Sequence, residues 1–187
     1  MKKLFPLALV MSFAIPLIAQ DADTKNEKAE PREERKRESN VWPAFFAVSE
    51  FPANPDVIGL RLTIPFSTQQ DNVTGLDLGL WGRALYFQGF QLNLLRNDVK
   101  DELCGIQAGL YNSVGGGQLL GLQAGLFNEA NSMRGAQVGL INIGGEVQGF
   151  QVGLINRTET MVGYQIGLIN VIRDAELQFF PIVNIGW

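Results

Sequence analysis

Apolar and polar side chains alternate over most of the chain in segments of about ten residues, and each segment opens on a glycine. In the segment that begins at Gly149, the side chains of Phe150 and Val152 fall on one side of an extended chain, and those of Gln151 and Gly153 fall on the other. A period of two residues is typical of a β-strand. A helix is disfavoured, because each glycine costs about 1 kcal/mol relative to alanine. The alternation therefore predicts an all-β domain.

The segments form a tandem repeat of the pattern GxQxGLxN, and successive lead glycines are separated by 16, 14, 16, 16, 14, 14 and 14 residues. The lead glycines are Gly59, Gly75, Gly89, Gly105, Gly121, Gly135, Gly149 and Gly163. An even spacing can return each residue type to the same face of a sheet. Together with FFAVSEF at residues 45–51 and FFPIVNIGW at residues 179–187, the repeats predict about ten short strands.

Three architectures can use this pattern. A strand that crosses an outer membrane needs about 9–11 residues with an apolar outer side and a polar or small inner side, and each repeat supplies this. We therefore expect a repetitive up-and-down antiparallel β-barrel. A β-solenoid is the alternative, although connecting segments such as RTET and EANS offer almost nothing for its interior. A soluble meander sheet would need a cover for its long apolar face.

The last strand favours the barrel. Its alternating residues are Phe179, Val183, Ile185 and the terminal Trp187. This ending resembles the closing strand of bacterial outer-membrane β-barrels. We expect it to complete the barrel against the first strand, with Trp187 on the apolar face.

A polar stripe follows the lead glycines at an offset of two residues. It consists of Arg61, Asp77, Gln91, Gln107, Gln123, Gln137, Gln151 and Gln165. Amides on neighbouring strands can pair with one another, and a polar conduit or a ligand-binding track is the functional alternative. Arg61 and Asp77 hold the same place on successive strands, so we expect them to form an ion pair. Five larger side chains should share this side and plug the interior, namely Tyr111, Phe127, Ile141, Ile155 and Ile169.

The N-terminal segments differ in composition from the repeats. Residues 1–20 carry two lysines, an apolar run and a small residue, as a secretory signal peptide does. Residues 21–41 are rich in both acids and bases and are expected to form a disordered arm. Residues 42–187 form the β-repeat domain.

The composition offers little for catalysis. Histidine is absent and Cys104 is the single cysteine. The sequence therefore lacks the residues needed for a histidine-based triad, for the usual metal sites and for an internal disulfide. We expect no enzyme activity, no metal and no cofactor. The net charge of −4 falls to −6 without Lys2 and Lys3, which makes nucleic acid a poor candidate partner.

Residues 57–187 as a whole resemble a group of uncharacterised bacterial surface-repeat proteins built from GLQ[IV]GL[IV]N units. The resemblance rests on the opening IGLRLTIPF, the unit GLDLGLW, the tandem core and the closing FFPIVN. It implies an exported bacterial protein, and no catalytic role can be transferred from it. We expect the protein at the outer membrane or cell surface of a Gram-negative-type bacterium. We expect a structural or surface role in contact with outer-membrane lipid, or alternatively a secreted or surface-attached solenoid used for adhesion or ligand binding.

Overall fold

The computed structural model describes residues 44–48, 56–67 and 70–187. The expected leader at residues 1–20 and the arm at residues 21–41 lie outside the described residues. Within these described ranges, no helix is long and apolar enough to span a membrane.

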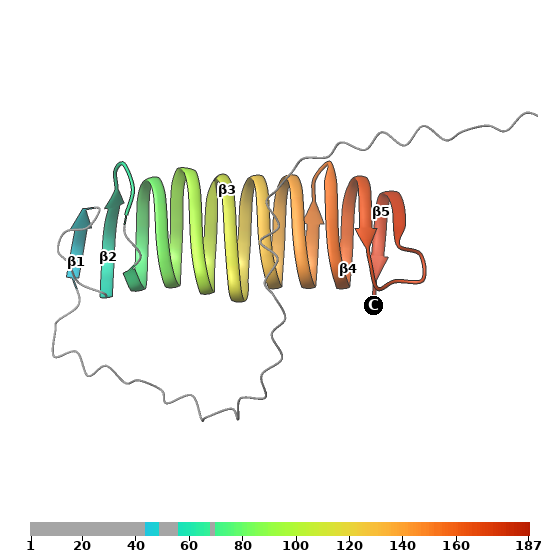
Figure 1. Ribbon diagram of the computed structural model, residues 1–187, viewed down its shortest axis with the longest axis horizontal. Coiled ribbons are helices and arrows are strands. Elements are labelled where there is room, and N and C mark those ends of the chain that lie inside the picture. Colours follow the sequence, from blue (N-terminus) through green and yellow to red (C-terminus); the bar gives the residue numbers. More distant parts are fainter. Residues whose placement is uncertain (1–43, 49–55, 68–69) are drawn as a thin grey trace, which may run out of the picture. The chain divides into compact units, whose positions relative to one another are not determined.

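The domain is built from β-strands that form one sheet in the order β1-β2-β3-β4-β5. The strands are β1 (Ala44–Val48), β2 (Asp56–Thr63), β3 (Gln70–Val152), β4 (Ile155–Ile172) and β5 (Phe179–Gly186). Strand β3 is a single extended stretch of 83 residues that winds through successive coils (Figure 1). The first three pairings are parallel, and β5 joins β4 in the antiparallel sense.

The register shows that each repeat pairs with the next repeat along the chain. Gly59 lies opposite Gly75 where β2 meets β3, and Gly149 lies opposite Gly163 where β3 meets β4. One repeat therefore makes one coil of a β-solenoid. The expectation of a barrel was wrong, because a barrel of this type requires antiparallel neighbours joined by hairpins.

Each coil has a long front strand and a short rear strand, joined by two bends. In the coil that begins at Gly149, the chain first bends at residues 154–155, where both side chains are exposed. A short rear strand then directs Asn156 and Thr158 inward, and a second bend follows at residues 159–160. The interior therefore needs little from the connecting segment, which is why the argument from RTET and EANS against a solenoid failed.

The first bend also corrects the position of the five large side chains expected inside. Phe127, Ile155 and Ile169 are exposed at this bend, and Tyr111 and Ile141 are partly exposed. The alternation of faces stops where the strand bends, so these residues do not share the side of the glutamines. They form an outer edge of the solenoid.

The lead glycines are required by conformation and by space. All eight have positive φ values, from 125° at Gly59 to 143° at Gly163, a region that side chains with a Cβ rarely adopt. A Cβ on Gly121 would also meet the carbonyl oxygen of Gly105 in the preceding coil. The repeat therefore keeps glycine at this position so that successive coils can stack closely.

Apolar side chains fill the space beside the second bend. One row stands two residues before the lead glycines and consists of Val57, Val73, Phe87, Leu103, Leu119, Met133, Val147 and Met161, all of them buried. Smaller residues of the rear strand, such as Ala84 and Val114, pack in the same cluster. The core is a narrow strip along the solenoid.

Strand β5 covers the last coil and does not meet the first strand. Ile185 pairs with Tyr164 and Val183 pairs with Ile166, so these residues continue the outer side of the front strands. Phe179 pairs with Val171 on the rear strand, and Trp187 is 96% exposed. The expectation that this strand closes a barrel against the first strand was therefore wrong. It caps one end of the solenoid, where an uncovered strand edge would otherwise remain.

Candidate functional site

The outer side of the front strands forms a continuous apolar surface, which we call the front face. It consists of the residues one and three positions after each lead glycine: Leu60, Leu62, Leu76, Leu78, Phe90, Leu92, Ile106, Ala108, Leu122, Ala124, Ala136, Val138, Phe150, Val152, Tyr164 and Ile166. None of them is buried, and Phe90 and Phe150 are 53% and 51% exposed. The rings of Phe150 and Tyr164 stack with centroids 5.8 Å apart. This face contains no charged residue.

The apolar surface continues to the first bend, and the opposite side of the molecule is mostly polar. A row of exposed leucines borders the front face five residues after the lead glycines, at Leu94, Leu110, Leu126, Leu140, Leu154 and Leu168. The outward residues of the rear strands are Arg83, Asp98, Ser113, Glu129, Ile143, Arg157 and Val171, which we call the rear face. The solenoid is therefore amphipathic across its section. A large exposed apolar surface of this kind marks an interaction site.

The glutamines of the repeat form a buried ladder behind the front face. From Gln107 onward, each amide nitrogen donates to the side-chain oxygen of the glutamine in the preceding coil, at 2.9 Å from Gln107 to Gln91 and 2.8 Å from Gln165 to Gln151. Several also donate to a backbone carbonyl six residues later, as Gln123 does to Glu129. All six glutamine side chains are buried. They stabilise the stacking of coils and are inaccessible to a ligand.

A second ladder of asparagines lies inside the first bend. Asn112 donates to Asn128, Asn128 to Asn142, and Asn142 to Asn156, at 2.8 to 2.9 Å. Each of these donors points to the following coil, so the asparagine ladder runs opposite to the glutamine ladder. Gly153 leaves room for it, because a Cβ there would meet Asn142 Nδ2 at 2.6 Å.

Arg61 and Asp77 occupy the first two positions of the polar stripe, and the expected ion pair is present. Arg61 Nη2 lies 2.6 Å from Asp77 Oδ2, and both side chains are fully buried. The same oxygen accepts hydrogen bonds from Gln91 Nε2 and Asn93 Nδ2. The stripe predicted from sequence therefore lies together inside the solenoid, where it forms a scaffold and no open track.

Aromatic and charged side chains meet on the outside of the first bend, a cluster that the sequence analysis missed. The Arg96 guanidinium lies 5.6 Å from the Trp81 ring and 4.8 Å from the Tyr111 ring. Tyr111 donates a 2.6 Å hydrogen bond to Glu129. Burial, and then this bond to a carboxylate, raise the pKa of Tyr111 to about 12. Its members come from different repeats at a bend, so alternation along a single strand gives no signal of it.

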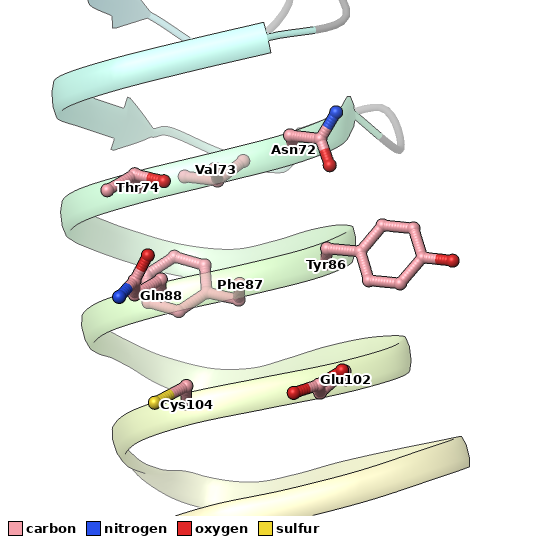
Figure 2. A pocket seen from close by; sticks show the side chains of 8 residues that line it. All are labelled: Asn72, Val73, Thr74, Tyr86, Phe87, Gln88, Glu102 and Cys104. Carbon is pink, nitrogen blue, oxygen red and sulfur yellow. The ribbon is translucent and has the colours of Figure 1, made fainter. Parts of the chain in front are cut away.

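A shallow groove of about 430 Å³ lies near the second bend, beside Cys104. Its lining comes from three successive coils, at residues 72–74, at residues 86–88, and at Glu102 and Cys104 (Figure 2). The ionisable side chains at its wall are Tyr86, Glu102 and Cys104. Among the residues that the structure describes, no group of three or more histidine, cysteine or acidic side chains could hold a metal ion.

Comparisons of the chain with protein-family models, with curated proteins and with solved structures find no match. The candidate site therefore rests on geometry, and the front face is an apolar surface that runs along successive coils.

Proposed function

We propose that this protein is an exported, non-enzymatic β-solenoid of the bacterial cell surface, which binds a partner through its front face. The observation that carries the proposal is the front face itself, with sixteen positions that hold no charge and of which none is buried. A soluble protein that leaves such a surface uncovered is prone to aggregate, so a partner is expected to cover it. The polar side chains of the repeats support a structural role, because their amides are used in buried ladders.

Export is supported by the sequence of residues 1–20, which has the pattern of a signal peptide. The resemblance of residues 57–187 to bacterial surface-repeat proteins supports the same destination. In this proposal, the solenoid is a stiff element that presents one apolar face for adhesion or assembly at the cell envelope.

Cell fractionation with matched variants tests the proposal. The front-face variant combines Val138→Glu and Val152→Glu, and the control is Ile143→Glu on the rear face, where Ile143 is 39% exposed and Val152 is 38% exposed. We expect the wild-type chain and the control to stay with the cell envelope through a high-salt wash, because apolar contacts resist salt. The front-face variant should be released. Recovery of the wild-type chain in the cytosol, or equal retention of both variants, would contradict the proposal.

A further inference from the structure

We propose that the partner of the front face is the front face of a second copy of this chain, so that two solenoids pack as a β-sandwich. This inference rests on the proposed function in one respect, namely that the front face is the binding surface. Parallel in-register coils hold its side chains in straight columns about 4.8 Å apart, and a second copy presents the same spacing. Two such faces pack with their sheets about 10 Å apart.

The size of the front face suits a stable dimer. Eight coils with lead glycines, at about 4.8 Å per coil and about five residues of 3.3 Å across, give a face of about 38 Å by 17 Å. This corresponds to about 650 Å² on each copy and about 1,300 Å² in total, which lies within the range of stable specific interfaces.

The charges favour a second copy over a bilayer. A peripheral protein binds anionic lipid with lysine and arginine placed beside its apolar surface. The column that precedes the lead glycines contains one such residue, Arg134, and the leucine row on the other border contains none. Residues 56–187 carry eleven acids and seven bases, a net charge of −4. A self-complementary apolar face needs no charges at its border.

Side-chain size also varies along the front face in a way that two copies can match. The middle coils contribute the small residues Ala108 and Ala124, and the coils after them contribute Val138 and Val152. If the two solenoid axes run antiparallel about a two-fold axis between the coils of Gly121 and Gly135, Val138 of one copy lies over Ala124 of the other, and Val152 lies over Ala108. Small residues then meet larger ones at these two pairs of positions in the middle of the interface.

Sedimentation equilibrium of the purified full-length chain tests the pairing. We expect the wild-type chain and Ile143→Glu to dimerise, and we expect the Val138→Glu and Val152→Glu double variant to raise the dimer dissociation constant at least about tenfold. Circular dichroism should show the same strand content in all three proteins, since the substituted side chains are exposed. A wild-type chain that stays monomeric, or one that instead floats with phosphatidylcholine vesicles, would overturn the proposal. A monomeric chain whose retention in the envelope still depends on the front face would leave the proposed function standing.

A thiol cross-linker tests the antiparallel arrangement. In a Cys104→Ser background, the pair Ala108→Cys and Val152→Cys should give a dimer cross-linked by a short bismaleimide, because such a reagent can span the roughly 10 Å between the two sheets, whereas a disulfide would need Cα atoms within about 7 Å. The two positions lie three coils apart within one chain, about 14 Å, so a short reagent does not bridge them internally. The control replaces Val152→Cys with Ile143→Cys on the rear face and should stay monomeric on a denaturing gel. A chain that sediments as a dimer but gives no cross-link would overturn this arrangement.

Discussion

Arg61 Nη2 donates to Asp77 Oδ2 at 2.6 Å, and neither side chain is accessible to solvent. The same carboxylate oxygen accepts from Gln91 at 3.1 Å and from Asn93 at 2.9 Å. Asp77 therefore anchors the glutamine ladder at its N-terminal end, where the amides direct their donors. Arg61 supplies the positive charge that makes this buried carboxylate tolerable.

Substitution of the pair should reveal strong coupling. Arg61→Gln and Asp77→Gln should each lower the free energy of unfolding by about 3–5 kcal/mol, because each leaves one buried charge without its partner. The double variant should recover much of the loss, since it restores the residue that the later repeats carry at this position. Urea unfolding of the four proteins measures the coupling. Strictly additive losses would contradict it, and Arg157→Gln, in an exposed pair with Glu159, should cost less than about 1 kcal/mol.

A lead glycine should not tolerate even one methyl group. Gly121 has a φ of 141°, and a Cβ would meet the carbonyl oxygen of Gly105. Gly121→Ala should therefore cost more than about 3 kcal/mol, since backbone strain and the displacement of a neighbouring coil add together. Thermal unfolding followed by circular dichroism measures the loss. Gly115→Ala, at an exposed bend, is the matched control and should change stability little.

One missing amide should interrupt the glutamine ladder on both sides. Gln151→Met keeps the shape of the side chain but removes the donor to Gln137 and the acceptor from Gln165. A loss of about 1–3 kcal/mol is expected, because buried polar groups are left without partners. The control, Gln148→Met, changes an exposed glutamine three residues away and should be nearly neutral. Equal unfolding midpoints for the two variants would show that the ladder contributes nothing.

The sequence predicts which side chains share a face of a strand better than it predicts how the chain runs from one strand to the next. Alternation correctly placed Val152 outward and Gln151 inward, because a local period of two residues decides which side chains share a face. It could not decide between a barrel and a solenoid, since both use the same alternation. The deciding feature is the bend near Leu154 and Ile155, where two adjacent side chains both point outward. Gly153 directly precedes this bend, but a glycine also opens every front strand, so a glycine alone does not mark the bend in the sequence.

The even spacing of the repeats has a different origin from the one expected. Between Gly89 and Gly105, one extra residue enters near Arg96 at the first bend and another near Asp101 at the second, compared with a 14-residue coil. The bends accommodate these insertions. Each insertion is one residue long, and the two together keep the spacing even. The cluster of Trp81 and Tyr111 could not be predicted from the sequence, because it forms between the bends of successive coils.

Tyr111 should titrate at unusually high pH. Its pKa is raised from 10.0 to about 12 by burial and by the bond to Glu129, so the folded state holds the phenol proton more tightly than the unfolded state does. The stabilisation is complete below pH 10 and is lost as the pH rises from 10 to about 12. The difference in absorbance at 295 nm between the wild-type chain and Tyr111→Phe isolates this titration.

Removal of the carboxylate tests the cause of the shift. Glu129→Gln should lower the pKa of Tyr111, because it removes the negative charge beside the phenol. Glu146→Gln, at the second bend of a later coil, is the control and should leave the titration unchanged. Identical titration curves for both variants would show that burial acts alone.

The two amide ladders oppose each other in polarity, and this bears on how such a protein can change its length. Glutamine dipoles point along the solenoid in one direction and asparagine dipoles in the other, as the bonds from Gln137 and Asn128 show. A duplicated 14-residue unit adds one glutamine dipole and one asparagine dipole that point in opposite directions. The solenoid therefore gains length without a growing net dipole of these side-chain amides along its axis. The chemistry of the terminal coils stays the same, and a gene that encodes this repeat can expand or contract by whole units while strand β5 continues to cover the last coil.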